Sequence, residues 1–361
     1  MLDLKIDADI TLAETLPAEF YRSKEIFDLS KEKIFARTWQ FVGDTEMIKI
    51  PGQCHPVSLL EEYLNEPILL TRDYDDKLHC ISNVCTHRGN LLIEAPSNLK
   101  ALKCRYHGRR FDLDGKFRFM PEFDECKNFP SEKDNLNQIP FDIWQNFIFV
   151  SLNPSAPMKS FINDMQMKVH WFDFDRLIFE PSRSKDYIVR ANWALYVENY
   201  LEGFHIPFVH SSLNDVLNYG EYYSELYPLS NLQLGIGKAS GENFKLPDSS
   251  EDKDKNVSAY YFWVFPNMMF NFYPWGLSIN IIRPLAVDLT KVSFLTYVSD
   301  PSKLEKGAGS GLDRVEREDE SIVEAVQKGM NSSFYSRGRY SPKREKGVHH
   351  FHRLLCEFLN N

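Results

Sequence analysis

Four side chains with metal-binding chemistry stand in two short, similar groups in the first third of the chain. Cys85 and His87 form a Cys-x-His pair, and Cys104 and His107 form a Cys-x-x-His pair after a gap of sixteen residues. Two thiolates and two imidazoles can hold a [2Fe-2S] cluster in which histidines replace cysteines on one iron. Such a cluster has a higher reduction potential than an all-thiolate one.

A structural zinc site is the competing interpretation, because two cysteines and two histidines also satisfy tetrahedral zinc. Zinc sites usually pair cysteine with cysteine and histidine with histidine, whereas each group here supplies one of each. Gly89 and Gly108 follow the two groups. Glycine suits tight loops that close over a cluster, because it adopts backbone angles that other residues avoid. The pattern therefore favours iron and sulfur.

A second group of candidate ligands comprises Glu202, His205 and His210, in a Glu-x-x-His-x₄-His pattern. We expect a helix here that places Glu202 one turn before His205. Pro207 removes an amide donor, so the helix should end just after His205 and His210 can return toward the same point. The apolar residues that recur at helical spacing are Trp193, Val197, Leu201 and Phe204.

A carboxylate is needed to complete the facial triad of two histidines and one acid that leaves iron(II) open to oxygen and substrate. Asp319 is the candidate, because it shares one face of an expected helix with Val315, Ile322 and Val326. A buried acid needs a partner, and a metal is one. The glutamates expected on other faces of this helix are Glu316, Glu318, Glu320 and Glu324.

Together these patterns resemble the catalytic alpha subunits of the Rieske-type non-haem iron oxygenases, over nearly the whole chain. The resemblance rests on Cys-Thr-His-Arg-Gly from Cys85, on Cys-Arg-Tyr-His-Gly from Cys104 and on the segment from Asn192 to His210. One departure is Arg109, where the family usually carries Trp. The resemblance implies a Rieske [2Fe-2S] cluster on Cys85, His87, Cys104 and His107. It also implies a mononuclear Fe(II) on His205, His210 and Asp319.

The same resemblance implies a role for Glu202 as the bridge for electrons between a cluster histidine and an iron histidine of neighbouring subunits in a homotrimer. Many members carry Asp at this position, and an exposed Glu on a solvated helix is the alternative interpretation. The chain has no Gly-x-Gly-x-x-Gly fingerprint for a nicotinamide or flavin. Electrons should therefore come from NAD(P)H through a separate reductase, with or without a ferredoxin.

The expected fold class is α+β, with three parts. Residues 1–44 should form a helical segment, capped at Ser23, that packs with the catalytic domain. Residues 45–153 read as an all-β Rieske domain with a hairpin at Asp114-Gly115. By resemblance, residues 154–361 form a helix-grip, START/Bet v1-like catalytic domain with an antiparallel sheet. Within it, we expect a solvated loop from Asp248 to Asn256 and strands at Tyr260–Phe265 and Met268–Trp275.

Composition and charge narrow the partners and the cellular compartment that we expect for this protein. The net charge of −9 without a basic stripe argues against nucleic acid. The opening residues lack a signal-peptide pattern, and no run is long enough to span a bilayer, so we expect a cytoplasmic protein without a membrane anchor. Six cysteines without framework spacing fit a reducing compartment. The late histidines, which we expect to pack or cap a terminal helix, are His349, His350 and His352.

Three functions remain open from the sequence. The first is O₂-dependent hydroxylation or N-demethylation of a small organic substrate such as a quaternary ammonium compound, as in the choline, betaine and carnitine branch that the chain resembles. The second is mono- or dioxygenation of an aromatic ring, and the third is a non-catalytic Rieske or zinc-stapled ligand-binding protein. Aromatic residues make up 14% of the chain and suit either a cation or an arene. The aromatic candidates for the pocket, of which alternation allows only some, are Phe204, Tyr261, Trp263, Phe270 and Phe272.

Overall fold

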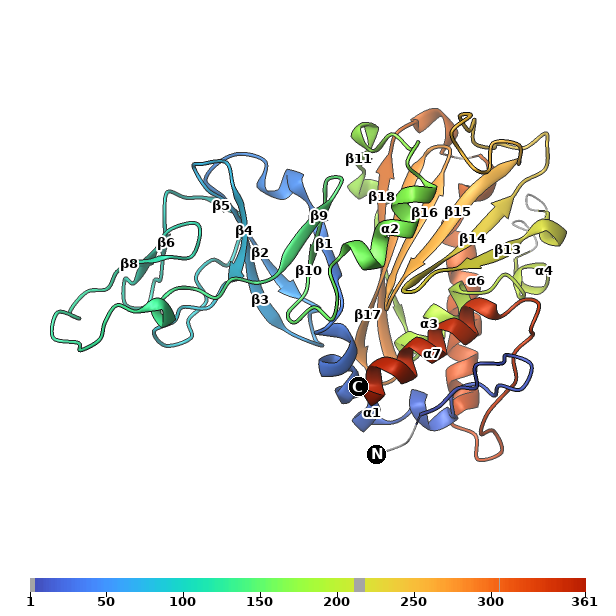
Figure 1. Ribbon diagram of the computed structural model, residues 1–361, viewed down its shortest axis with the longest axis horizontal. Coiled ribbons are helices and arrows are strands. Elements are labelled where there is room, and N and C mark those ends of the chain that lie inside the picture. Colours follow the sequence, from blue (N-terminus) through green and yellow to red (C-terminus); the bar gives the residue numbers. More distant parts are fainter. Residues whose placement is uncertain (1–3, 211–217, 305) are drawn as a thin grey trace. The chain divides into compact units, whose positions relative to one another are not determined.

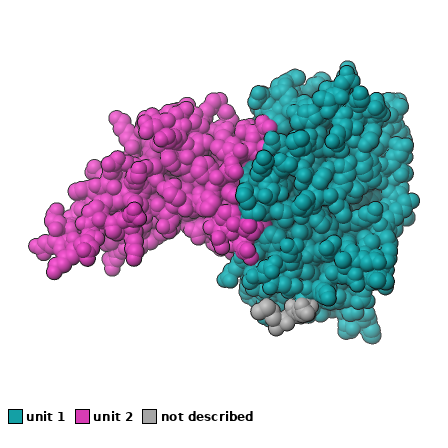
Figure 2. Space-filling view, viewed as in Figure 1, with its two compact units in different colours: residues 1–34, 156–361 teal, residues 35–155 magenta. Residues whose placement is uncertain are grey.

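The computed structural model describes residues 4–210, 218–304 and 306–361, and the chain divides into two compact units. Unit 1 consists of residues 1–34 and 156–361, and unit 2 of residues 35–155 (Figure 2). Among the described residues, no helix has the length and apolar character that crossing a bilayer would require.

Unit 2 is built from short antiparallel strands and 3₁₀ turns (Figure 1). Its strands form three sheets, in the orders β4-β3-β2-β5, β1-β10-β9 and β6-β7-β8. The strands are β1 Gln40–Asp44, β2 Gln53–Leu59, β3 Glu66–Arg72, β4 Leu78–Ser82, β5 Ser97–Asn98, β6 Leu102–Lys103, β7 Arg110–Phe111, β8 Phe117–Phe119, β9 Phe141–Trp144 and β10 Phe147–Val150. The 3₁₀ turns are Thr45–Ile48 and Glu132–Asp134.

The hairpin predicted at Asp114-Gly115 is confirmed. It joins β7 to β8, and Gly115 has φ +85°, a left-handed conformation that glycine adopts without a steric penalty. One apolar core of unit 2 lies beneath this hairpin and includes two cysteines of the predicted cluster. Its buried residues are Cys54, Leu69, Ile81, Cys85, Leu92, Leu102, Cys104, Phe111, Leu113 and Leu136.

Unit 1 contains one eight-stranded antiparallel sheet. Seven strands follow the order β11-β18-β17-β16-β15-β14-β13, and β12 pairs with another part of β18. The predicted aromatic strands are confirmed as β15 and β16, and every residue of β16 is buried. The strands are β11 Ile178–Phe179, β12 Lys185–Val189, β13 Tyr223–Leu226, β14 Ser230–Ile236, β15 Val257–Val264, β16 Met268–Tyr273, β17 Gly276–Ala286 and β18 Leu289–Val298.

Helices pack against this sheet, which confirms the α+β class. The predicted cap at Ser23 is present, because its side chain accepts a hydrogen bond from the amide of Ile26 at 3.2 Å. Helix α2 contacts strands β14 and β15, and α3 contacts β17, α6 and α7. The helices are α1 Lys24–Ser30, α2 Lys159–Lys168, α3 Trp193–Tyr200, α4 Ile206–Val209, α6 Leu312–Met330 and α7 Lys346–Asn360, with a π-turn at Lys31–Phe35. The 3₁₀ turns are Ala18–Tyr21, Phe174–Arg176, Pro181–Arg183, Tyr219–Glu221, Pro301–Lys303 and Gly307–Gly309.

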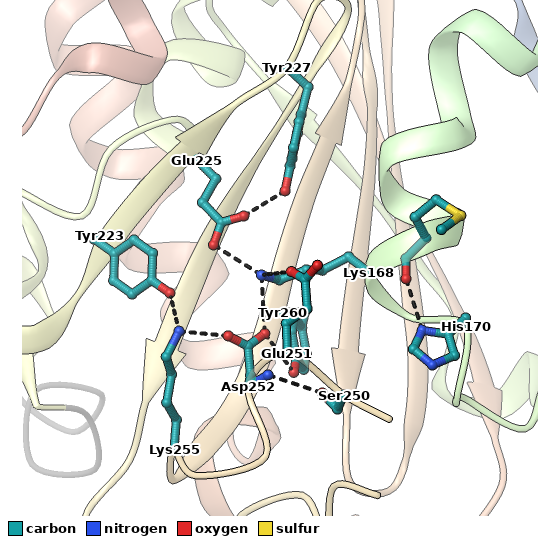
Figure 3. A network of polar contacts seen from close by, with 11 residues as sticks. Lys168, His170, Tyr223, Glu225, Tyr227, Ser250, Glu251, Asp252, Lys255 and Tyr260 are labelled. Carbon is teal, nitrogen blue, oxygen red and sulfur yellow. Dashed lines mark hydrogen bonds and ion pairs between the residues drawn. The ribbon is translucent and has the colours of Figure 1, made fainter. Parts of the chain in front are cut away.

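The prediction of a fully solvated loop from Asp248 to Asn256 is wrong at Asp252, which is buried (Figure 3). Lys255 lies 2.6 Å and Lys168 3.3 Å from its carboxylate, and Tyr260 donates a hydrogen bond to it at 3.2 Å. Burial alone would raise the pKa of Asp252, but the two lysines outweigh it and the pKa lies below its usual value. A buried charge persists only when it is paired. Lys255 belongs to the loop itself, whereas Lys168 on α2 and Tyr260 on β15 lie outside it.

The late histidines are packing residues, as predicted. Nε2 of His349 lies 2.7 Å from the carbonyl of Asp7, and His352 lies between Tyr340 and Glu198. Burial lowers the pKa of His350 to about 4. Of the cysteines outside the predicted cluster, Cys126 is exposed and the others are buried.

Candidate metal centres

The two predicted cluster loops of unit 2 have the same backbone design. In the first, the amide of Gly89 donates to the carbonyl of Cys85 at 3.0 Å. In the second, the amide of Gly108 donates to the carbonyl of Cys104, also at 3.0 Å. Gly89 and Gly108 have φ of +71° and +76°, so both loops use a left-handed glycine to turn back after the histidine. Each loop thus presents one cysteine and one histidine on a tight turn.

The side chains on these loops converge. Nδ1 of His87 lies 3.2 Å from Nδ1 of His107, with the rings edge to face. Cys85 and Cys104 are both buried and interact with each other. Burial lowers the pKa of His87 and raises that of the Cys85 thiol. Two buried thiols and two facing, partly exposed imidazoles are a donor set that fits a [2Fe-2S] cluster with mixed ligands.

In unit 1, the segment that carries Glu202, His205 and His210 differs from the prediction. Helix α3 ends at Tyr200, so Glu202 is not on a helix with His205. Its carboxylate accepts hydrogen bonds from the amides of Phe204 and His205, the latter at 3.1 Å. These amides would otherwise bond to carbonyls of a continuing helix, so the glutamate itself forms the turn. Pro207 lies in the first turn of the new helix α4 instead of ending the old one.

Three side chains nevertheless meet at one point, which is the strongest metal-like feature of unit 1. One nitrogen each of His205 and His210 and one oxygen of Asp319 all lie within 4.8 Å of one another. Nε2 of His210 lies 2.9 Å, and Nε2 of His205 3.4 Å, from the same Asp319 oxygen. Two imidazoles and one carboxylate facing a common centre are the ligand set of a non-haem iron(II) triad with open positions.

Two further carboxylates hold the outer nitrogens of these histidines. Nδ1 of His205 lies 2.7 Å from Glu202, and Nδ1 of His210 lies 2.8 Å from Glu318. Such pairs fix the ring orientation and raise the basicity of a histidine ligand. Glu318 is the functional residue that the sequence missed, since it was expected on another face of the helix. Its position directly before Asp319 gives no periodic signal.

The charges around the triad favour a cation. Burial alone would lower the pKa of His205, but Asp319 and Glu202 raise it to about 9. The pKa of His210 is raised in the same way by Asp319 and Glu318, against the effect of burial. The pKa of Asp319 is lowered although burial acts to raise it. A metal ion bound here would displace these histidine protons and take over the same carboxylate charge.

The prediction of which face of α6 is buried is wrong. Ile322 and Val326 are 40% and 39% exposed, whereas Glu316 is buried. The inner face is polar because it meets polar groups: the hydroxyl of Tyr196 donates to Glu316, and the Gln327 side chain accepts from the amide of Asn192 at 2.8 Å. Periodicity of apolar residues therefore gave the wrong reason for the position of Asp319. The buried residues of α6 are Glu316, Val323, Gln327 and Met330.

A cavity of about 110 Å³ opens beside the triad. It is small compared with the roughly 300–1,000 Å³ of sites for drug-sized ligands. Its wall is aromatic and polar, with one buried acid apart from the metal-binding cluster, Glu316. The aromatic residues that line it are Tyr196, Tyr200, Tyr222, Tyr261, Tyr273 and Phe294. The polar uncharged residues are Asn199, Gln233, Asn271, Ser278 and Asn280.

Of the five aromatic side chains suggested by the sequence, only Tyr261 lines this cavity among the described residues. On β16, alternation brings Asn271 and Tyr273 to the cavity and turns Phe270 and Phe272 away. The backbone at Gly203 approaches Tyr222 so closely that an added Cβ would lie 2.5 Å from the ring, so glycine there lets the tyrosine reach the cavity. The remaining two suggested residues that do not line the cavity are Phe204 and Trp263.

Comparison with known protein families gives the class. The profile of the Rieske [2Fe-2S] domain matches residues 38–130. The profile of the ring hydroxylating alpha subunit (catalytic domain) matches residues 174–361, more than half of the chain. The chain therefore belongs to the ring-hydroxylating alpha subunits, the catalytic components of the Rieske-type non-haem iron oxygenases. Its cofactors are a Rieske [2Fe-2S] cluster and a mononuclear iron, and it is an oxidoreductase that serves as a terminal oxygenase component.

Named relatives lie within this class. The chain is 28% identical to the chloroplastic choline monooxygenase of Spinacia oleracea over 96% of this chain and 79% of that protein. It is 27% identical to the carnitine monooxygenase oxygenase subunit of Escherichia coli (strain K12), over 97% and 95% of the two chains.

Two solved structures share the fold. The quaternary ammonium Rieske monooxygenase CntA in complex with L-carnitine matches with a TM-score of 0.77 at 23% identity, over 97% of each chain. Naphthalene 1,2-dioxygenase with bound indole matches with a TM-score of 0.74 at 17% identity, over all of this chain and 95% of the other.

Proposed function

We propose that this terminal oxygenase oxidises a small cation of the quaternary ammonium class. The observation that carries the proposal is Glu316, a buried carboxylate in the wall of the cavity that also contains the triad. A buried acid is stable only with a partner. Tyr196 donates one hydrogen bond to Glu316, while burial and the nearby carboxylates of Asp319 and Glu320 raise the pKa of Glu316 well above its usual value. A cation bound in the cavity would lower that pKa and stabilise the charged carboxylate.

The site residues take the following roles in this proposal. Cys85, His87, Cys104 and His107 hold the Rieske cluster, and His205, His210 and Asp319 hold the iron. When bound, the iron supplies the activation of O₂. Glu202 and Glu318 hold the outer nitrogens of the two histidines, so the Nε2 atoms stay directed at the centre.

The tyrosines suit a cation that has no N–H to donate. Aromatic faces attract quaternary ammonium groups through the ring quadrupole, and five tyrosines line this cavity. Tyr261 and Tyr273 pack edge to face with ring centres 5.9 Å apart, which fixes the rings against each other. Tyr200 is held by a hydrogen bond to Asn271 at 2.7 Å. These contacts restrain the tyrosine side chains that line the cavity before a substrate enters.

An arene fits the same cavity less well. Its apolar surface would offer no positive charge to Glu316 and no donor to the side-chain oxygen of Gln233, and unsatisfied buried polar groups are costly. This Gln233 oxygen is buried without a hydrogen bond, although the side-chain amide nitrogen donates to the carbonyl of Tyr200. The relatives named for choline and carnitine also favour a quaternary ammonium substrate over an arene.

The reaction inserts one oxygen atom of O₂ into a C–H bond of the substrate. The other oxygen leaves as water, and two electrons and two protons are consumed. Oxidation at an N-methyl group would lead to demethylation, and at another carbon to an alcohol. The electrons would come from an NAD(P)H-dependent reductase, directly or through a ferredoxin, because the chain carries no nicotinamide or flavin fingerprint.

We further propose that the protein works as a homotrimer in which Glu202 carries electron transfer from the cluster of a neighbouring subunit. Its contact with Nδ1 of His205 at 2.7 Å supports the iron end of this bridge. At saturating iron, Glu202→Gln should keep both metal centres, because glutamine retains an acceptor oxygen, but should slow product formation. Normal turnover by this variant would refute the bridge, and sedimentation of the native protein tests the trimer.

The substrate is tested by single turnover of chemically reduced protein with O₂, with mass spectrometry of the products. The panel contains choline, its neutral carbon isostere 3,3-dimethylbutanol, and toluene. We expect oxidation of choline in preference to the isostere, and little oxidation of toluene. Glu316→Gln should remove the preference for the charged compound, whereas Glu357→Gln, the same change at an exposed position of α7, should leave it intact.

Other outcomes would overturn the substrate class. A phenol or diol from toluene as the main product would make the protein an arene hydroxylase. Equal oxidation of choline and its isostere by the native protein would show that the protein does not recognise the positive charge of the substrate. Iron content measured on the same samples separates loss of the metal from loss of the cation site.

A further inference from the structure

Arg109 stands in the second cluster loop, directly after Gly108, where the family usually carries Trp. The side chain is only 2% exposed, and it is one of the largest fully buried side chains of the molecule. Its guanidinium lies 2.6 Å from Oδ1 of Asp134 and 3.2 Å from the carbonyl of the same residue. A tryptophan would bring neither the charge nor the forked set of donors.

Three phenylalanine rings enclose this cation. The centre of the guanidinium lies 4.9 Å from the ring centre of Phe117, 5.5 Å from that of Phe129 and 5.7 Å from that of Phe111. Arginine stacks on aromatic faces and is more weakly hydrated than lysine, so it tolerates such a place. One donor nitrogen, Nε, is buried without a hydrogen bond. The site therefore keeps a positive charge out of water at a real energetic cost.

This ion pair is connected to both cluster loops. The carbonyl of Arg109 accepts from the amide of Cys104 at 2.8 Å, which closes the second loop. The carbonyl of Asp134 accepts from the hydroxyl of Thr86 at 2.8 Å, and Thr86 stands between Cys85 and His87. Arg109 is close enough for its charge to act on both Cys85 and His87.

The two charges of the pair are not equally screened. Arg109 is buried, whereas the side chain of Asp134 is 19% exposed and receives further hydrogen bonds from Ser131, at 2.7 Å from the amide and 3.0 Å from the hydroxyl. Solvent and local dipoles weaken a charge that they reach, and a buried charge acts over a longer distance. The pair should therefore leave a net positive potential at the cluster.

We propose that the Arg109–Asp134 pair sets the reduction potential of the Rieske cluster, with Arg109 raising it and Asp134 limiting the rise. Reduction adds one electron, and hence one negative charge, to the cluster, so a nearby buried cation stabilises the reduced state. Arg109 is thus a positioning and tuning residue and not a catalytic one. The proposal depends on the cluster in unit 2 and not on the substrate of unit 1.

The test is a redox titration of the cluster in the purified holoenzyme, followed by its visible and EPR spectra. Arg109→Gln, which keeps a donor for Asp134 but loses the charge, should lower the reduction equilibrium constant at least about threefold, or about 28 mV for one electron. Asp134→Asn should shift the potential upward. Arg109→Lys, which keeps the charge, should lie closer to the native value than Arg109→Gln.

The opposite signs distinguish tuning from packing. A merely structural pair would shift the potential in the same direction from either end, or would not shift it, and either result would overturn the proposal. If Arg109→Gln fails to retain the cluster, Asp134→Asn decides alone, since only a rise supports the proposal. The matched control is Arg118→Gln in the exposed pair with Asp112, which should leave the potential unchanged.

Discussion

The two metal centres of this protein are assembled in opposite ways. In unit 2, each cluster loop contains its two proposed ligands within four residues, and both loops are closed by the same glycine turn. In unit 1, His210 and Asp319 are separated by 109 positions, and Asp319 reaches the histidines from a different helix. The cluster loops can be recognised from short motifs, whereas the iron triad depends on how α6 packs against α3.

Each centre is therefore sensitive to different changes. A local loop loses its function when a ligand is replaced, and it is only destabilised when its glycine turn is changed. A non-local site costs conformational entropy, because distant segments must be brought together. Additional hydrogen-bond partners offset this cost. Glu202 and Glu318 are such partners, one for each histidine. Substitutions at the two centres should therefore differ in how strongly they lower metal content, activity or stability.

The largest effect is expected for Asp319→Ala. The variant loses the carboxylate whose oxygen faces both Nε2 atoms, so it should lose the mononuclear iron and lower activity by more than about hundredfold, beyond the range for outer partners. Iron analysis and turnover measure this. The cluster spectrum should stay native, and a variant with full iron content would contradict the ligand assignment.

Cys104→Ala is the reciprocal change in unit 2. It should abolish the visible absorption of the cluster, because the thiolate is an obligatory ligand, while the iron of unit 1 is retained. Cys126→Ala removes an exposed thiol and should leave the cluster intact. Loss of iron from both centres in the Cys104 variant would mean that the two sites are not independent.

An intermediate effect is expected for Glu318→Gln. Glutamine keeps an acceptor for Nδ1 of His210 but lacks the charge that raises the basicity of the ring. The affinity for iron should fall roughly tenfold, at the lower end of the range for partners of metal ligands. Titration of iron into the metal-free protein measures this. An unchanged affinity would mean that the Glu318 contact only reflects a surface ion pair with Arg314.

The smallest effect is expected for Gly89→Ala. No atom lies within 4 Å of the added Cβ, so the only cost is the left-handed backbone, about 1–2 kcal/mol. The temperature at which the cluster absorption is lost should fall accordingly. Gly329→Ala is the opposite control, because this glycine lies inside α6 with equally open surroundings, and alanine should stabilise the helix by about 0.5–1 kcal/mol.

Several residues show how far sequence reasoning reaches. The glycine turns and the aromatic strands were predictable, because their signals lie in neighbouring residues. The helix through Glu202 was not, because a glutamate side chain replaced the carbonyl acceptors that a helix would have used. Asp252 and Glu316 were misplaced in the same way, since Lys168 and Tyr196, which pair with them, come from distant elements.

The chemistry available to this protein follows from its amino-acid sequence: two Cys-and-His loops, two histidines with a late aspartate, and the family to which they point. These features depend on side-chain type and short spacing, which a linear chain fixes directly. Tertiary structure alone decided that Glu318 holds His210, that Glu316 faces the cavity and that Tyr200, Tyr222 and Tyr273 enclose it. Burial and pairing of a polar side chain are set by whatever packs against it, and those partners are distant in the sequence.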